Sequence, residues 1–334
     1  MSISKQEVVS RYLPEVLQPG TRAEAFAPSN IALCKYWGKR DVELNLPINS
    51  SLSISLGDLG SLTSITESEI GVDQVYLNDE ALSADSRFAK KVLAFLELFR
   101  RELRQPVIVR TTNNIPTAAG LASSASGFAA LTLAINDFYG LELSDNCLSA
   151  FARMGSGSAS RSIYQGFVEW NKGSSVDGMD SCAQQLDYKW PGFRIGLLKV
   201  AIGEKKVDSR AGMQRTVESA ALYGAWPQQA ENDLVTIKRA IVDRDLQLLG
   251  QTAEHNALSM HATMIASWPP LLYWQPESVA AMHRVWELRE SGVSIYLTMD
   301  AGPNLKLIYQ QADESRIRDA FPELLDVDIV APFD

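Results

Sequence analysis

The chain has 334 residues, of which 46% are hydrophobic and 21% are charged, an ordinary composition for a globular protein long enough to build a large core. Its formal net charge of −9 argues against a nucleic-acid-binding surface, and no apolar run approaches the ~20 residues of a membrane span. The N-terminus has no apolar stretch typical of a signal peptide. Three cysteines without a CxxC pair favour free thiols in a reducing cytoplasm.

The predicted helices and strands follow one another without a regular alternation. Helices are expected in the N-terminal segment and over 85–104, 128–138, 231–250 and 276–290. Strands are expected over 51–57, 74–77, 106–112, 193–202 and 293–299. This mixture predicts an α+β fold with a seam near residue 190. We therefore expect an N-terminal lobe over 1–190, in which 1–24 form an appendage, and a C-terminal lobe over 191–334.

A loop of small residues over 116–125 leads directly into one of the predicted helices. Small residues such as Gly120 and Ala122 let the backbone close around an oxyanion, and the free N–H groups of the first helical turn point at it. Ser123 and Ser124 add hydroxyl donors. The loop therefore indicates a phosphate site, although it lacks the Gly-Lys-Ser/Thr of a Walker A motif. A plain helix cap packed with small residues is the alternative.

A second loop of small residues, GSGSASRS over 155–162, adds an arginine to the same chemistry. If a helix begins near Gly157, Ser158 and Arg161 share one face and Ser156 lies at its N-terminus. A guanidinium beside hydroxyls and free N–H groups suits a carboxylate. The alternative is an arginine paired with a structural acid. Two such loops in one chain predict ligands with more than one anionic centre.

Asp300 follows the predicted strand 293–299 and precedes a Gly-Pro turn. A carboxylate at the end of a buried strand has a rigid base and an open side, which suits a general base. An aspartate that caps its own turn is the alternative interpretation.

Longer motifs connect these sites. They are APSNIALCKYWGKRD over 27–41, LPINSS over 46–51, NNIPTAAGLASSASG over 113–127, GSGSASRS with GFVEW over 155–170, MHAT over 260–263 and MDAGPN over 299–304. In this order they resemble the motifs of the diphosphomevalonate decarboxylases, members of the GHMP kinase superfamily. The resemblance extends over roughly residues 25–310.

The resemblance implies a two-lobed GHMP-kinase-like fold with the active site in the cleft between the lobes. The implied reaction uses ATP and Mg²⁺ to phosphorylate the 3-hydroxyl of (R)-5-diphosphomevalonate, and loss of that phosphate with carbon dioxide gives isopentenyl diphosphate. Such an enzyme is a carbon–carbon lyase of isoprenoid biosynthesis. Its partners would be small molecules rather than nucleic acid or membrane, and a homodimer is left open.

The resemblance also implies roles for individual residues. Asp300 would be the base near the 3-hydroxyl, and Arg161 would hold the carboxylate with support from Asn30; with Lys39 these form the implied catalytic set. The residues implied to surround the anionic groups of the substrate are Tyr36, Lys39, Ser156, Ser158, Arg161 and Arg210. The residues implied to face the ATP phosphates are Lys35, Gly120, Ala122, Ser123 and Ser124. No metal ligand is assigned.

Some positions need separate expectations. Asp208 precedes Ser209 and Arg210 where the family often has two serines, and Arg87 lies roughly where the family has an arginine. Cys34, Trp37 and Trp170 are expected to pack in the core. The alternatives in the same superfamily are a decarboxylase of the monophosphate and a mevalonate-type kinase. A nucleotide-binding protein without catalysis is the alternative from another class.

Overall fold

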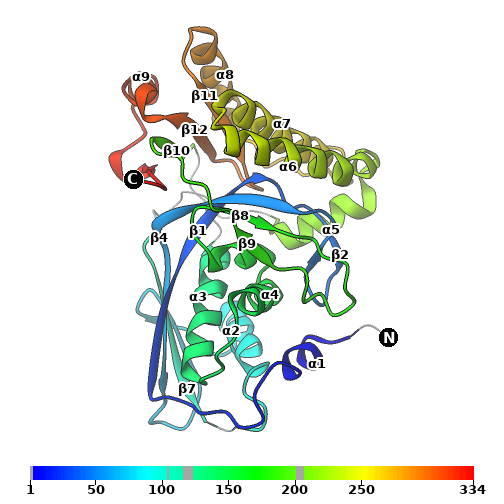
Figure 1. Cartoon of the computed structure of the whole chain (residues 1–334), viewed down its shortest axis with the longest axis vertical. Helices are drawn as coiled ribbons and strands as arrows, with labels where there is room; N and C mark the ends of the chain where they lie inside the picture. Colours follow the sequence, from blue (N-terminus) through cyan, green and yellow to red (C-terminus); the bar gives the residue numbers. More distant parts are fainter. Residues whose placement is uncertain (1–2, 104, 116–122, 201–206) are drawn as a thin grey trace.

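The computed structural model describes residues 3–103, 105–115, 123–200 and 207–334. Within these residues the strands form a seven-stranded sheet, a four-stranded sheet and a two-stranded hairpin. The seven-stranded sheet and its helices occupy the lower part of Figure 1, and the four-stranded sheet occupies the upper part. Gly120 and Ala122, assigned to the phosphate loop, lie outside the described residues.

The larger sheet has the order β6-β5-β7-β4-β8-β9, and β1 pairs with β4. The bounds of its strands are β1 Arg22–Cys34, β4 Ser51–Glu67, β5 Gln74–Leu77, β6 Glu80–Ala81, β7 Val107–Asn113, β8 Phe167–Trp170 and β9 Ala183–Gln185. The long antiparallel pairing of β1 with β4 has register irregularities on both sides of Asn30. Such irregularities bend a strand and re-aim its side chains, and here they lie at the residue that reaches the cleft.

Helices cover one face of this sheet (Figure 1). Their bounds are α2 Arg87–Glu97, α3 Ser123–Phe138 and α4 Asp145–Gly155. α3 packs against both β1 and β4, so its first turn is held next to the irregular part of β1. The helix predicted over 85–104 begins after the capping hydroxyl of Ser86 and already ends at Glu97. The segment after α4 is a 3₁₀ helix, η1 Gly157–Ile163, whose tighter winding stacks Ser158 and Arg161 on one face.

The smaller sheet has the order β11-β12-β10-β13. Its strands are β10 Phe193–Leu198, β11 Ile295–Met299, β12 Leu305–Gln310 and β13 Ile329–Val330. The accompanying helices are α5 Ser209–Ser219, η2 Ala221–Ala225, α6 Trp226–Asp243, α7 Leu246–Ile265, α8 Pro276–Glu290, η3 Gln311–Asp313, α9 Glu314–Ala320 and η4 Asp326–Asp328.

The prediction of one helix over 231–250 is wrong, because α6 ends and α7 begins inside that range. Arg244 takes a left-handed conformation with φ of 52°, which ends α6. The carboxylate of Asp245 then accepts the N–H of Leu248 at 2.9 Å and caps α7. The helix predicted over 276–290 is confirmed by α8.

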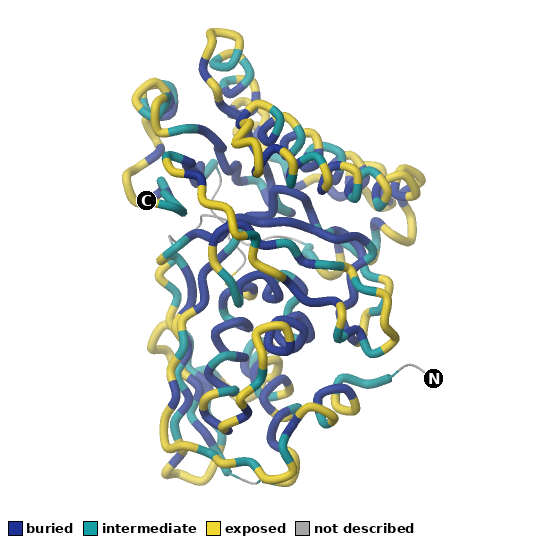
Figure 2. The backbone as a smooth tube through the Cα atoms, in the orientation of Figure 1, coloured by how far each residue is buried: buried dark blue, intermediate teal, exposed yellow. Residues whose placement is uncertain are grey.

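The largest buried cluster joins residues from both sides of position 190. Ile31 of β1 and Ile54 of β4 belong to the same cluster as Ile195 of β10 and Ile237 of α6. In Figure 2 the buried trace accordingly continues from the upper ends of β1 and β4 to the helices above them. The division at 190 stays a prediction about chain organisation.

The N-terminal appendage contains the predicted short helix, α1 Lys5–Ser10. Ser4 caps it, and Val8 and Val9 are completely buried. They belong to the same cluster as Leu44, which lies between β2 Lys39–Asp41 and β3 Leu46–Pro47. The appendage therefore packs behind the hairpin that carries Lys39.

Candidate active site

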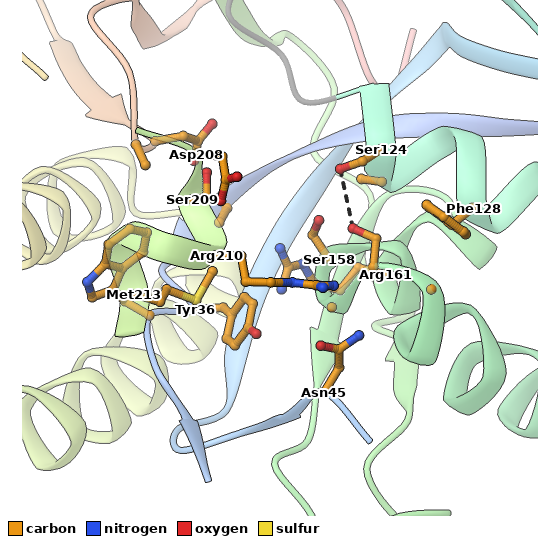
Figure 3. A pocket seen from close by; sticks show the side chains of 18 of the residues that line it. Tyr36, Asn45, Ser124, Phe128, Ser158, Arg161, Asp208, Ser209, Arg210 and Met213 are labelled. Atoms are coloured by element: carbon orange, nitrogen blue, oxygen red, sulfur yellow. Dashed lines mark hydrogen bonds between the residues drawn. The ribbon is translucent and has the colours of Figure 1, made fainter. Parts of the chain in front are cut away.

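A cavity of about 730 Å³ is lined by residues that lie next to the seven-stranded sheet and by residues that lie next to the four-stranded sheet. Figure 3 shows side chains from η1, α3, α5 and the segment after β1 converging on it. The predicted site residues that line it are Asn30, Lys35, Tyr36, Lys39, Ser124, Ser156, Ser158, Arg161, Arg210 and Asp300. The fold therefore brings together the motifs that are far apart in the sequence.

Arg161 is a buried guanidinium held by neutral groups. Its Nη1 donates to Ser51 Oγ at 2.6 Å, and Nε and Nη2 each donate to Asn30 Oδ1 at 3.3 Å. Asn30 is itself fixed, because its Nδ2 donates to Ser162 Oγ at 2.8 Å. Burial lowers the pKa of Arg161 to about 10, and the nearby Asp300 carboxylate raises it in part. A buried cation with only neutral hydrogen-bond partners among the described residues is suited to bind an anionic ligand.

Asp300 lies in the turn after β11, as expected, and its side chain keeps 34% of its surface exposed. Its Oδ1 accepts from Lys35 Nζ at 2.9 Å, and its main-chain oxygen lies 3.1 Å from His261 Nε2. Burial lowers the pKa of His261 to about 4, helped by the charge of Lys35, so the imidazole is neutral. Because the carbonyl can only accept, Nε2 carries the proton of this ring. The carboxylate is thus anchored and still open to the cavity.

Lys35, which the resemblance assigns to the ATP phosphates, has its side chain next to Asp300. Its side chain is 2% exposed, and Nζ donates to Ala32 O at 2.8 Å and to Asp300. Its main-chain N–H donates to Asn256 Oδ1 at 2.8 Å. Burial lowers the pKa of Lys35, and Asp300 opposes this shift. The Lys35 ammonium is therefore paired with Asp300, because a buried cation needs a nearby opposite charge to compensate its loss of hydration.

The other end of the cavity is strongly cationic. Lys39 Nζ donates to Asn45 Oδ1 at 2.6 Å, and Lys91 and Arg210 line the same cavity. Burial lowers the pKa of Lys39 to about 8, and the positive charges of Arg210, Lys5 and Lys91 add to the shift. Like charges so close together repel one another, and a bound multiply charged anion would turn this crowding into a favourable interaction.

Hydroxyl groups complete this cationic end. The hydroxyl of Tyr36 is buried and has no hydrogen-bond partner among the described residues, and burial raises its pKa. Ser124 Oγ lies 3.3 Å from Ser156 Oγ, the contact drawn as a dashed line in Figure 3. Ser158 also lines the cavity. An unpaired buried hydroxyl costs free energy unless a ligand accepts from it, so these groups fit phosphate oxygens.

The first turn of α3 presents Ser123 and Ser124 as exposed residues. Exposed hydroxyls at a helix N-terminus fit the phosphates of a nucleotide. Among the described residues, no three His, Cys, Asp or Glu side chains gather where they could hold a metal ion. Mg²⁺ is commonly held by nucleotide phosphates with only one or two protein ligands, so the hydroxyls of Ser123 and Ser124 fit a magnesium ion that arrives with ATP.

Arg87 and Asp208 lie at the mouth of the cavity. Arg87 Nη2 of α2 donates to Asp208 Oδ2 at 2.6 Å, and Asp208 caps α5 by accepting the N–H of Ala211 at 3.0 Å. The aspartate that departs from the family pattern thus holds the helix that carries Arg210, whose side chain is exposed.

The three residues expected in the core are there: Cys34 and Trp170 are fully buried and Trp37 is 2% exposed. All three cysteines are free thiols and buried. In the part of the chain that the structure describes, we find no helix long and apolar enough to cross a membrane.

Sequence reasoning missed several residues near the site, above all Asn45, His261 and Lys306. Asn45 lines the cavity in a left-handed conformation with φ of 54°. His261 lies in the MHAT motif, which on its own indicates no role for the histidine. The signal for Lys306 was a lone charged residue inside the apolar run LKLIY, shortly after Asp300.

Comparisons with known proteins agree on one family. The model for the diphosphomevalonate decarboxylase-like N-terminal domain matches residues 27–183, and that for the mevalonate 5-diphosphate decarboxylase C-terminal domain matches residues 197–328. A diphosphomevalonate decarboxylase of Candida albicans is 38% identical over 315 residues, covering 88% of this chain and 86% of that protein.

Solved structures give the same result. Mevalonate diphosphate decarboxylase from Staphylococcus aureus matches with a TM-score of 0.85 at 39% identity, covering 93% of this chain and 94% of that chain. A structure described as "MDDEF in complex with MVAPP, AMPPCP and Magnesium" matches with a TM-score of 0.84 at 40% identity, covering 93% and 95% of the two chains. These matches confirm the fold class expected from the sequence.

Proposed function

Because the chain belongs to the diphosphomevalonate decarboxylase family, we propose that its cavity converts (R)-5-diphosphomevalonate and ATP to isopentenyl diphosphate, ADP, phosphate and carbon dioxide. The observation that carries the proposal is the pairing of an open carboxylate, Asp300, with a buried guanidinium, Arg161, that has only neutral hydrogen-bond partners among the described residues. One group can receive a proton from a hydroxyl, and the other can hold a carboxylate nearby.

The chemistry requires two steps. Phosphoryl transfer from ATP forms a P–O bond to the 3-hydroxyl oxygen while the bond between the γ-phosphorus and the β-phosphate oxygen breaks and ADP leaves. The hydroxyl proton passes to a base. The C3–O bond then breaks as phosphate leaves, and the electrons of the bond to the carboxylate carbon form the double bond while carbon dioxide departs. Phosphorylation must come first, because hydroxide is a poor leaving group from the tertiary carbon C3 and phosphate is a good one.

The cavity supplies groups for both steps. Asp300 accepts the hydroxyl proton, and Arg161 with Asn30 orients the carboxylate. Tyr36, Lys39, Ser156, Ser158 and Arg210 bind the diphosphate end. Ser123 and Ser124 bind ATP phosphates, and Mg²⁺ neutralises charge on the phosphoryl group during transfer. Lys35 supports Asp300, the position that its contacts favour.

Product analysis tests the proposal. The purified protein is incubated with ATP, Mg²⁺ and 5-diphosphomevalonate, and ADP, phosphate and carbon dioxide are measured. Equal amounts of the three products are expected. ADP without carbon dioxide would identify a mevalonate-type kinase, and no product at all would identify a nucleotide-binding protein without catalysis.

The cationic end of the cavity favours a diphosphate over a monophosphate. Lys39, Lys91 and Arg210 line it, and none of them forms an ion pair with a carboxylate among the described residues. A diphosphate carries more charge than a monophosphate and reaches further toward Arg210. The same assay with mevalonate 5-phosphate decides: a higher kcat/KM for the monophosphate would reverse the assignment.

The proposal includes a cytoplasmic location, supported by three buried free thiols. Assembly into a homodimer stays an expectation from the resemblance. Light scattering of the purified protein measures its mass and tests it.

A further inference from the structure

Two lysines have almost completely buried side chains in the described part of the chain, and both approach the same carboxylate. Lys35 and Lys306 are each 2% exposed. Lys35 Nζ lies 2.9 Å from Asp300 Oδ1, and Lys306 Nζ lies 3.5 Å from Asp300 Oδ2. Lysine is rarely buried this far because removing an ammonium from water is costly, so a buried lysine needs a compensating partner.

Lys306 occupies a position where an apolar residue would be expected. It lies within β12, opposite Leu197 of β10 and Thr298 of β11, and its neighbours Leu305 and Leu307 are completely buried. Within the described part of the chain, its Nζ donates one hydrogen bond, a long one of 3.4 Å to Asn304 O. That weak contact alone does not compensate a buried charge, whereas a carboxylate at 3.5 Å contributes a Coulombic attraction.

The two lysines bracket Asp300 from different elements. Lys35 follows β1 and binds one carboxylate oxygen, and Lys306 of β12 approaches the other. The 3.5 Å separation is an ion-pair distance rather than a hydrogen-bond distance, so Lys306 acts mainly through its charge. Among the described residues, the other charged or titratable groups near Asp300 include Arg161 of η1 and His261 of α7, and His261 is neutral.

We propose that Lys306 is a positioning residue for Asp300, which keeps the carboxylate ionised and turned toward the substrate hydroxyl. The inference rests on the proposed function, because it assumes that Asp300 accepts the hydroxyl proton. Lys306 does not line the cavity, so it acts on the reaction through Asp300 rather than through the substrate.

The test compares kcat, both KM values and the pH profile of kcat for the wild type and Lys306→Met. Methionine keeps the length of the side chain and removes the charge. We expect kcat to fall roughly tenfold, less than for complete loss of a base. Both KM values should stay within about threefold of the wild type, since the lysine does not touch either substrate.

The pH profile of kcat distinguishes an effect on the charge of Asp300 from a purely structural effect. Loss of a positive charge near a carboxylate makes protonation easier, so the acid limb of kcat should move to higher pH, by about one unit for a charge at this distance. Lys238→Met is the matched control, because Lys238 pairs with Glu169 at 2.6 Å away from the cavity. Its kcat and acid limb should equal those of the wild type.

A double variant decides whether Lys306 acts through Asp300. If it does, adding Lys306→Met to Asp300→Asn should not slow the reaction further. An equal additional loss in both backgrounds would overturn the proposal, as would an unchanged kcat and acid limb in Lys306→Met. Lys306→Gln replaces the methionine variant if that variant does not fold. Failure of both to fold would show a purely structural role. A wild type that releases no carbon dioxide would instead refute the proposed function.

Discussion

The ammonium of Lys39 donates a hydrogen bond of 2.6 Å to the side-chain oxygen of Asn45. Asn45 in turn donates through Nδ2 to the main-chain oxygens of Arg153 and Met154, at 3.0 and 2.9 Å. One buried amide therefore ties the cation of the β2–β3 hairpin to the last turn of α4. That helix leads directly into the serine loop, so Lys39 and Ser156 keep a fixed relation.

We expect Asn45→Gly to raise the KM for the phosphorylated substrate about fivefold, equivalent to ~1 kcal/mol for loss of the hydrogen bond that holds Lys39. Glycine accepts the left-handed backbone at this position, so the change removes the amide without adding strain. Steady-state kinetics at saturating ATP measure the effect. Asn78→Gly is the control, since Asn78 has a φ of 49° in a turn remote from the cavity. An unchanged KM in Asn45→Gly would mean that Lys39 needs no such support.

We expect kcat/KM to fall as the pH rises above ~8. Lys39 is protonated below its pKa of about 8, which burial sets well under the usual value, and it loses its charge above it. An uncharged amine attracts phosphate less, and kcat/KM reports groups of the free enzyme. Lys39→Arg keeps its charge at higher pH, so this basic limb should disappear. The same limb in both proteins would assign it to another group.

Asp300→Asn should lower kcat by at least ~10²-fold, the low end for loss of a general base. The KM for ATP should change little, because in the proposed function the carboxylate acts on the substrate hydroxyl. The amide also leaves Lys35 without its charged partner, so circular dichroism and thermal unfolding are needed to show that the variant is folded. Near-normal turnover in a folded variant would mean that Asp300 only caps its turn and is not the base.

Arg161→Lys and Arg210→Lys should have different kinetic effects. Arg161 contacts Asn30 and Ser51 through its planar fork, and the proposed function gives it the substrate carboxylate; lysine cannot copy this geometry, so kcat should fall. Arg210 is exposed at the cationic end, so its replacement should mainly raise the KM for the diphosphate substrate. Kinetics with diphosphate and monophosphate substrates separate the two effects. Equal losses on both substrates in Arg210→Lys would show that Arg210 does not bind the terminal phosphate.

Val9→Ala should reduce the free energy of unfolding by about 2 kcal/mol, from the lost apolar contact and the cavity left behind. Val9 is completely buried beneath the hairpin, whereas Val16, the matched control, is 75% exposed. Urea denaturation of both alanine variants measures the difference. Equal stabilities would mean that the appendage contributes no packing energy.

The sequence was most informative where chemistry is local. Asp300 at a strand end and Arg161 after a run of serines could be recognised because their neighbours in sequence define their surroundings. Asn45 and Lys306 could not, because their partners lie on other elements: Arg153 on α4 for one and Asp300 after β11 for the other. A single sequence does not give such distances.

The missed helix break has a similar cause. Hydrophobic periodicity runs through Arg244, and a left-handed arginine leaves no signature like that of a glycine. Asp245, which caps α7, is a residue type typical of helix N-termini, but aspartate is also common within the polar face of a helix. Tertiary packing of α6 against α7 decides where the chain turns.

The apolar cluster that unites Ile31 and Ile54 with Ile195 and Ile237 has a consequence for folding. A fragment that ended near residue 190 would expose this face of β1 and β4 to water, and one that began there would leave α6 without its support. Each half also has a buried cluster of its own, but the shared cluster couples the two, so heating should melt the whole molecule in one cooperative transition. The cleft therefore lies next to a buried cluster that both halves build. The relative positions of Lys35 and Asp300 are set when the two halves fold together.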